Sequence, residues 1–162
     1  MNQQDFPFLD PDGRGAAGGI VSDARTVPQY LALQATLRPS AVCMREKRFG
    51  IWRAYTWSEV RARVLAAAQG LLSLGVSPGA RVAQLGSNRP ELYWATSAAQ
   101  SIGAIPVPLY SDSNPDELLH PLSHAQVEVV FAEDQEQVDK ILQLKSQLPS
   151  LRWIIHVGNK GL

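Results

Sequence analysis

The sequence predicts a Rossmann-like α/β fold, with a mostly parallel sheet, flanking helices and a leading β-hairpin. Short apolar runs alternate with helical patterns between residues 81 and 157, as in parallel strands joined by crossover helices. The runs are apolar almost throughout, which is typical of strands covered on both faces. No repeat of fixed period and no coiled-coil heptad points to another architecture.

A helix and a hairpin are expected first. Thr26 is placed to cap a helix that has Pro28 in its first turn and ends before Pro39. Residues 41–46 and 50–55 then have strand-like composition, and Gly50 suits the turn between them.

A long helix is expected next. Thr56 and Glu59 form a T-x-x-E capping box at its start, and Gly75 is its expected stop. Apolar residues recur at helical spacing and define the predicted buried stripe, which consists of Trp57, Val60, Val64, Ala68, Leu71 and Leu72.

The alternating units follow. Strands are expected at 81–86, 104–110, 127–133 and 151–157, and helices at 91–102, 116–119 and 134–148. Gly103 ends the first of these helices, and Asn114 with Pro115 begins the second. Pro121 is expected to end the second helix early, because proline lacks an N–H group and clashes with the preceding turn.

The composition is that of one ordinary globular domain. The chain has 162 residues, of which 45% are hydrophobic and 19% charged, so it can bury a core without cross-links. Fifteen basic residues balance fifteen acidic ones, and this balance favours neither a nucleic acid nor an anionic membrane surface as partner. No signal peptide and no transmembrane segment is visible, so we expect a cytoplasmic protein.

Cys43 is the only cysteine of the chain. A single cysteine excludes an internal disulfide and a cysteine-based zinc site. Its apolar neighbours predict a buried, inert thiol rather than a nucleophile.

Gly13, Gly15 and Gly18 have the G-x-G-x-x-G spacing of a dinucleotide-binding loop. Such a loop needs a buried strand before it and a helix after it. The residues before it contain two prolines and no strand pattern, and those after it have no helical period. We therefore interpret these glycines as part of a flexible N-terminal tail, residues 1–25.

Ligands of open parallel sheets bind beyond the carboxyl ends of the strands. The segments expected there are 86–90, 110–115, 133–136 and 158–161. In the second segment, Ser111, Asp112, Ser113 and Asn114 carry groups suited to a ribose or a phosphate. A turn followed by a helix cap requires the same residue types, so cap chemistry accounts for them without a ligand.

Other residues with metal or acid–base chemistry have structural explanations. His120 and His124 have the spacing of a helical metal pair, but Pro121 is expected to disrupt the helix and further ligands are missing. Asp134 and Glu136 could form an acid pair, yet acidic side chains are favoured at any helix start.

His156 lies in an apolar strand with no evident partner. The four tryptophans are expected to pack in the core rather than to form a stacking platform; they are Trp52, Trp57, Trp94 and Trp153. We assign no catalytic, cofactor-binding or metal-binding residue to this chain.

Four stretches occur in order along the chain: REK-x-x-GIW-x-x-YTW at 45–57, LGV-x-PG-x-RVA at 74–83, NRPE at 88–91 and EDQEQVDK at 133–140. In combination they resemble the N-terminal part of bacterial long-chain acyl-CoA synthetases, which are AMP-forming adenylate ligases. The resemblance covers residues 26–157.

For the full-length family, the resemblance implies a two-step reaction that needs Mg²⁺. ATP and a fatty acid give an acyl-adenylate and pyrophosphate, and CoA then displaces AMP. The family's phosphate loop and catalytic lysine have no counterpart within these 162 residues. We therefore expect residues 26–157 to form an N-terminal α/β subdomain and 158–162 a truncated end. Alone, the chain is expected to need no cofactor and to be inactive.

Two other interpretations stay open. The chain could be a self-contained module that binds a small ligand or nucleotide through its strand-end loops. It could instead be a non-catalytic interaction protein that associates with itself or an intact synthetase through an uncovered sheet surface.

Overall fold

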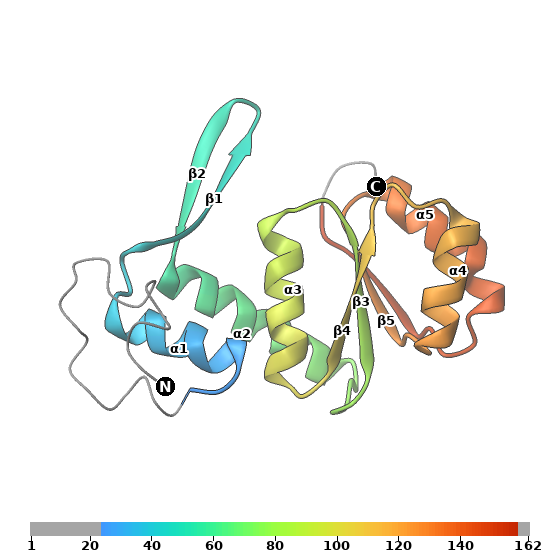
Figure 1. Ribbon diagram of the computed structural model, residues 1–162, viewed down its shortest axis with the longest axis horizontal. Helices are drawn as coiled ribbons and strands as arrows, with labels where there is room; N and C mark the ends of the chain where they lie inside the picture. The colour runs from blue at the N-terminus through green and yellow to red at the C-terminus, as the bar shows by residue number, and fades with distance from the viewer. Residues whose placement is uncertain (1–23, 159–162) are drawn as a thin grey trace.

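The computed structural model describes residues 24–158, and Figure 1 shows a central sheet with helices on both sides and a projecting hairpin. The helices are α1 (Val27–Leu37), α2 (Trp57–Ser73), α3 (Pro90–Ser101), α4 (Pro115–His124) and α5 (Gln135–Leu144), with a 3-10 turn, η2 (Lys145–Gln147). The strands are β1 (Val42–Arg48), β2 (Ile51–Thr56), β3 (Arg81–Gly86), β4 (Ile105–Tyr110), β5 (Val129–Ala132) and β6 (Trp153–His156). Gly13, Gly15 and Gly18 lie outside the described residues.

The main sheet has the strand order β4-β3-β5-β6, and every neighbouring pair is parallel. β1 and β2 form a separate antiparallel sheet. The predicted fold class, with its parallel sheet and leading hairpin, is therefore confirmed.

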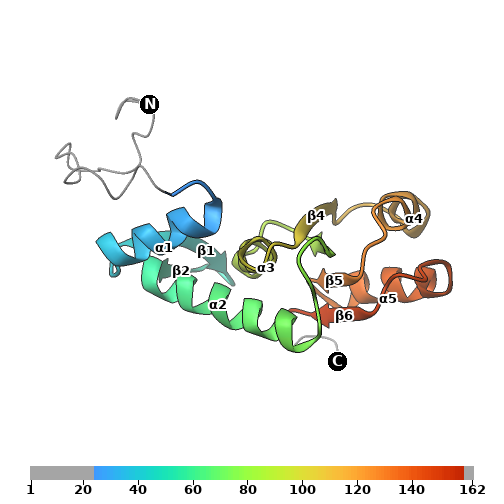
Figure 2. The same ribbon diagram turned by 90° about the horizontal axis from the view of Figure 1, so that it is seen from below.

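Two hydrophobic cores lie on opposite faces of the sheet, and Figure 2 shows the helices that cover them. Val82 and Val129 face the core under α2 and α3, whereas Ala83 and Val130 face the core under α4 and α5. This alternation follows from the opposite orientation of successive side chains in a strand. The inner strands β3 and β5 are thus covered on both faces.

The predicted stripe of α2 is largely confirmed, since Val60, Val64, Ala68 and Leu71 are buried. The prediction is wrong for Leu72, whose side chain is 54% exposed. One residue beyond Leu71 is a rotation of about 100° around the helix, which turns Leu72 away from the core.

The helices begin at the polar residues that the sequence predicts as N-caps. Thr26, Thr56 and Asn114 each cap a helix in a reciprocal capping box, and Asp134 caps α5. Gly75 adopts a φ of 76° just beyond α2, as a glycine stop does.

Pro121 does not end α4, contrary to prediction, because the helix continues to His124. The proline removes one N–H donor, but Leu118 and Leu122 on the same helix are 1% exposed and pack into the second core. Burial of these two leucines offsets the missing hydrogen bond. The Pro121 carbonyl still accepts a hydrogen bond from Ala125 N at 3.0 Å.

Candidate functional site

The carboxyl ends of the parallel strands bring the segments after β3, β4 and β5 to one edge of the sheet. This edge is where open α/β sheets bind ligands. Two features occupy it in the described residues, a charged cluster and a pocket.

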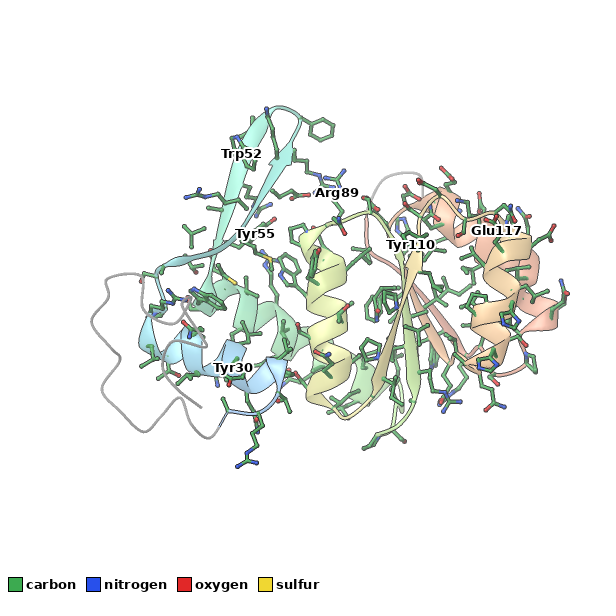
Figure 3. All side chains as sticks on the ribbon, in the orientation of Figure 1. Tyr30, Trp52, Tyr55, Arg89, Tyr110 and Glu117 are labelled. Atoms are coloured by element: carbon green, nitrogen blue, oxygen red, sulfur yellow. The ribbon has the colours of Figure 1, made fainter. Side chains whose placement is uncertain are left out.

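The charged cluster is centred on Arg89, which precedes α3. Its Nε donates to Glu133 Oε1 at 3.0 Å, and its Nη1 donates to Glu46 Oε1 at 2.9 Å. Ser87 donates to Glu133 Oε2 through its backbone N–H at 2.5 Å and its hydroxyl at 2.7 Å. Figure 3 shows Arg89 at the start of α3, beside the hairpin. The cluster therefore joins β1, the start of α3 and the end of β5.

The two carboxylates of this cluster are largely buried, so their hydrogen bonds contribute to the stability of the fold. The Glu46 side chain is 5% exposed and the Glu133 side chain 19% exposed. Burial alone raises the pKa of Glu133, but the hydrogen bonds from Ser87 and Arg89 outweigh it and hold that pKa below its ordinary value. Hydrogen bonds to Glu46 and Glu133 raise the pKa of Arg89, so the guanidinium stays charged.

Gly86 allows Glu133 to approach the strand end. A Cβ at Gly86 would lie 2.5 Å from Glu133 Cβ and 2.8 Å from Leu92 Cδ1. Both distances are shorter than any carbon–carbon contact without repulsion. A side chain at position 86 would therefore displace Glu133.

A pocket of about 600 Å³ lies beside this cluster, between α3 and the ends of β3 and β4. Its lining consists of Gln84, Gly86, Ser87, Asn88, Leu92, Tyr93, Thr96, Pro108, Leu109, Tyr110 and Ser111. The lining combines hydroxyl and amide groups with aromatic and aliphatic surface and contains no Lys, Arg, Asp or Glu. Such a lining suits an uncharged part of a small molecule. Tyr110, labelled at the end of β4 in Figure 3, lies at the edge of the pocket and is 85% exposed.

Gln84 is the one buried polar side chain of this lining. Its Nε2 donates to the carbonyl of Val82 at 2.8 Å, which fixes the orientation of the amide. Its Oε1 is buried without a hydrogen-bond partner among residues 24–158. A buried acceptor without a donor costs stability unless something pairs with it.

Of the four polar residues after β4, Asn114 has the predicted cap role and Ser111 lines the pocket. Asn114 accepts the backbone N–H of Glu117 at 3.0 Å and so caps α4. Ser111 lines the pocket, and its hydroxyl donates to Asp112 at 3.1 Å. Lys140 donates to the carbonyl of Ser111 at 2.8 Å, which ties this loop to α5.

His120 and His124 lie on one continuous helix, so the expected disruption by Pro121 is wrong here too. Their rings stack with centroids 5.7 Å apart. Within residues 24–158, no group of three His, Cys, Asp or Glu side chains is arranged to hold a metal ion.

Asp134 accepts the N–H of Gln137 at 3.1 Å as the cap of α5. Glu136, in the first turn, pairs with Lys140 at 2.9 Å. The two carboxylates therefore have separate structural partners. His156 lies on β6 at the sheet edge, and its buried Nε2 lacks a hydrogen-bond partner in the described part of the chain.

Cys43 is half-buried and packs against the first core. Burial raises the pKa of its thiol, while nearby Arg38 lowers it, and the net direction is upward. A raised pKa reduces the thiolate fraction and with it the reactivity of the sulfur.

The tryptophans do not all pack in the core. Trp94 is 7% exposed and meets Tyr55 edge to face, with ring centroids 5.2 Å apart. Trp52 is 65% exposed on the hairpin, so the packing role expected for it is wrong. Trp153, at the sheet edge, is 42% exposed. A strand of a two-stranded hairpin has no second layer to cover it, which explains the exposure of Trp52.

Sequence reasoning missed the cluster of Glu46, Arg89 and Glu133. Arg89 and Glu133 each follow a predicted strand, so their position at the sheet edge was a usable signal. Glu46 lies 43 residues from Arg89 in the sequence, and nothing local predicts that contact.

This arrangement is that of an open α/β sheet with a pocket and a charged cluster at the carboxyl edge of its parallel strands, the edge where such sheets bind ligands. The chain belongs to the AMP-binding enzyme family, which matches residues 31–161. The family expected from the sequence is therefore confirmed.

Relatives and solved structures agree with this family. A long-chain-fatty-acid–CoA ligase, FadD15 of Mycobacterium bovis, is 27% identical over 155 residues, which are 96% of this chain and 24% of that protein. The human long-chain-fatty-acid–CoA ligase ACSBG1 is 29% identical over 109 residues, 67% of this chain and 15% of that protein. The acetoacetyl-CoA synthetase of Streptomyces lividans superposes with a TM-score of 0.77 at 25% identity, covering 83% of this chain and 22% of that one. The chain thus spans about a quarter or less of the length of these proteins.

Proposed function

We propose that this chain contributes the amino-terminal α/β subdomain of an AMP-forming ligase that joins a long-chain fatty acid to CoA. The family match over residues 31–161 is the observation that carries the proposal. The names of the curated relatives, long-chain-fatty-acid–CoA ligases, support a fatty acid and CoA as substrates. In this reaction the carboxylate attacks the α-phosphate of ATP and releases pyrophosphate, and the CoA thiol then displaces AMP.

ATP and Mg²⁺ belong to this reaction, but the residues of this chain do not fit them. The sequence has no stretch of the Ser/Thr/Gly-rich type that forms the family's phosphate loop. Among residues 24–158, no group of three His, Cys, Asp or Glu side chains is arranged to hold a metal ion. We expect the isolated chain to be inactive. A cytoplasmic location stays a prediction; none of the helices among residues 24–158 is long and apolar enough to cross a bilayer.

Two measurements test the proposal, a pyrophosphate-release assay and the DNA sequence downstream of Leu162. Purified 1–162 should release no pyrophosphate in the presence of ATP and palmitate, and release that depends on both would contradict the subdomain proposal. The DNA after the codon of Leu162 should continue in frame into a phosphate loop. The longer product should then form acyl-CoA from palmitate faster than from acetate, and the reverse preference would refute the long-chain substrate.

The pocket beside α3 favours a second candidate, a module that binds a small ligand by itself. Its lining joins aromatic surface to Gln84 Oε1, an acceptor that has no partner in residues 24–158. Calorimetric titration of 1–162 with ATP, AMP and palmitoyl-CoA tests this candidate. Saturable binding that Thr96→Val or Ser111→Ala weakens would support it, and an absence of heat with all three compounds would exclude them as its ligands.

A further inference from the structure

Helix α4 lies at the end of the molecule opposite the hairpin (Figure 1). Leu118 and Leu122 on its inner side are each 1% exposed, and they pack in the second core with residues of α5 and the sheet. His120 and His124 are both exposed. The helix is thus a firmly packed element that carries two imidazoles on its outer surface.

The two imidazoles are neighbours on this surface. Residues four apart in a helix lie one above the other on the same face. The ring centroids are 5.7 Å apart, and the ring planes differ by 20°. Pro121 does not interrupt the helix between them, so the alignment is kept. Within the part of the chain that the structure describes, neither imidazole has a hydrogen bond or an ion pair, so nothing there competes for the ring nitrogens.

This spacing suits a metal ion that is bound by one nitrogen of each ring. With metal–nitrogen bonds of about 2.0–2.1 Å, two imidazoles on one ion have ring centres roughly 4.5–5.2 Å apart. The observed separation of 5.7 Å is only slightly longer. The χ2 angle of histidine varies over a broad range, so small rotations turn one nitrogen of each ring toward a shared ion.

The charges of the helix favour a cation at this place. α4 contains no Lys or Arg, and Asp116 and Glu117 lie one turn before His120. Glu117 accepts the backbone N–H of Asn114 at 3.0 Å, so it acts as a cap and adds negative charge without being a ligand. His124 is in the last turn, where the carbonyl end of the helix attracts positive charge.

We propose that His120 and His124 form a two-imidazole site for a divalent transition-metal ion on the outer face of α4, with Cu²⁺ bound most tightly. Imidazole suits copper, nickel and zinc, and Cu²⁺ stands highest in the order of divalent affinities. Water completes the coordination, because no third His, Cys, Asp or Glu among residues 24–158 is arranged to join the pair.

The site is independent of the ligase reaction, since it uses only α4. Mg²⁺ prefers oxygen ligands, so the ion of that reaction is not the ion expected here. The pair carries no metal assignment from the sequence alone, where Pro121 is expected to break the helix between the two rings.

The test uses the 162-residue chain and Cu²⁺ added as the chloride, at one equivalent per chain. Electron paramagnetic resonance should show hyperfine structure from two imidazole nitrogens. An excess of Ni²⁺ or Zn²⁺ should displace the copper only at higher concentrations than Cu²⁺ itself requires, and an excess of Mg²⁺ should not displace it.

Single variants remove one ligand each. His120→Gln and His124→Gln should each weaken copper binding by about tenfold or more, because one imidazole alone loses the second bond of the chelate. Glutamine is a good helix former, so circular dichroism should show the fold unchanged.

Two double variants separate the pair from histidine content. His124→Gln with Gln69→His keeps three histidines but moves one to an exposed position of α2, and it should bind copper as weakly as His124→Gln. His124→Gln with Asp116→His rebuilds a pair four residues apart and should restore most of the binding.

Any of four results would overturn the proposal. They are unchanged copper binding by His120→Gln, hyperfine structure from a single nitrogen, no restoration by Asp116→His, and a copper-bridged dimer in sedimentation. The last result would mean that each ion joins imidazoles from two chains. An inactive or an active ligase leaves all four measurements unaffected, so the two proposals fail separately.

Discussion

At the residue scale, a side chain at position 86 would overlap its neighbours and lower the stability of the fold. Gly86→Ala should destabilise the protein by about 1–3 kcal/mol, because the new Cβ would overlap Glu133 and Leu92. Gly70→Ala is the matched control, since a Cβ there meets nothing within 4 Å and alanine favours the helix by roughly 0.5–1 kcal/mol. Urea unfolding of both variants gives the comparison, and equal midpoints would contradict the crowding at Gly86.

Arg89 pairs with the carboxylate of Glu46, whose side chain is only 5% exposed. Arg89→Gln should cost about 1–3 kcal/mol, because Glu46 would stay buried without its cation. Adding Glu46→Gln should recover part of that loss, as removing both charges is less harmful than removing one. A double-mutant cycle by urea unfolding measures the coupling, and additive effects would show that the ion pair contributes nothing.

Glu133 makes stability depend on acid pH. Its pKa in the folded protein lies below the ordinary value of 4.5, so the unfolded chain takes up the proton first as pH falls. The stabilisation is complete above the unfolded pKa and disappears as pH falls through the folded one. The stability difference between wild type and Glu133→Gln should therefore shrink between neutral pH and about pH 3, and a constant difference would rule out this linkage.

At the element scale, helices and strands could be predicted because their signals are local. Thr56 with Glu59 and Asn114 with Pro115 begin helices where the sequence places them, since a capping box involves residues only three apart. The predicted end of α4 at Pro121 is wrong, because burial of Leu118 and Leu122 on the same helix overrides the local preference of proline. The partners of Arg89 could not be predicted, because tertiary packing alone brings Glu46 and Glu133 to it.

The turn between β1 and β2 offers a prediction about stability. Phe49 has a φ of 51° and Gly50 a φ of 81°, and two positive values in succession are typical of a type I′ turn. Asparagine adopts this conformation more readily than phenylalanine, so Phe49→Asn should stabilise the protein by up to about 1 kcal/mol. The melting temperature should rise, and a fall would mean that Phe49 is held by packing.

At the scale of the whole molecule, the two edges of the main sheet are not equally protected. The backbone N–H of Ile105 donates inward to the carbonyl of Ala80 at 2.8 Å. Because successive backbone nitrogens of a strand alternate in direction, those of residues 106 and 108 face outward. Those positions are Pro106 and Pro108, which have no N–H to offer another strand. The β4 edge is therefore blocked.

The β6 edge contains no proline between Trp153 and His156, and we expect the isolated chain to associate there. Trp153 donates to the carbonyl of Glu128, just before β5, and Val157 donates to Ala132 of β5. The N–H groups of Ile154 and His156 therefore face outward. Sedimentation velocity should show association that increases with concentration and is reduced by Trp153→Lys, because an edge lysine disfavours strand pairing. Ile105→Lys on the blocked edge is the control and should change nothing. A monomer at every concentration would refute association through β6, whereas a dimer sensitive only to Ile105→Lys would place it at the other edge.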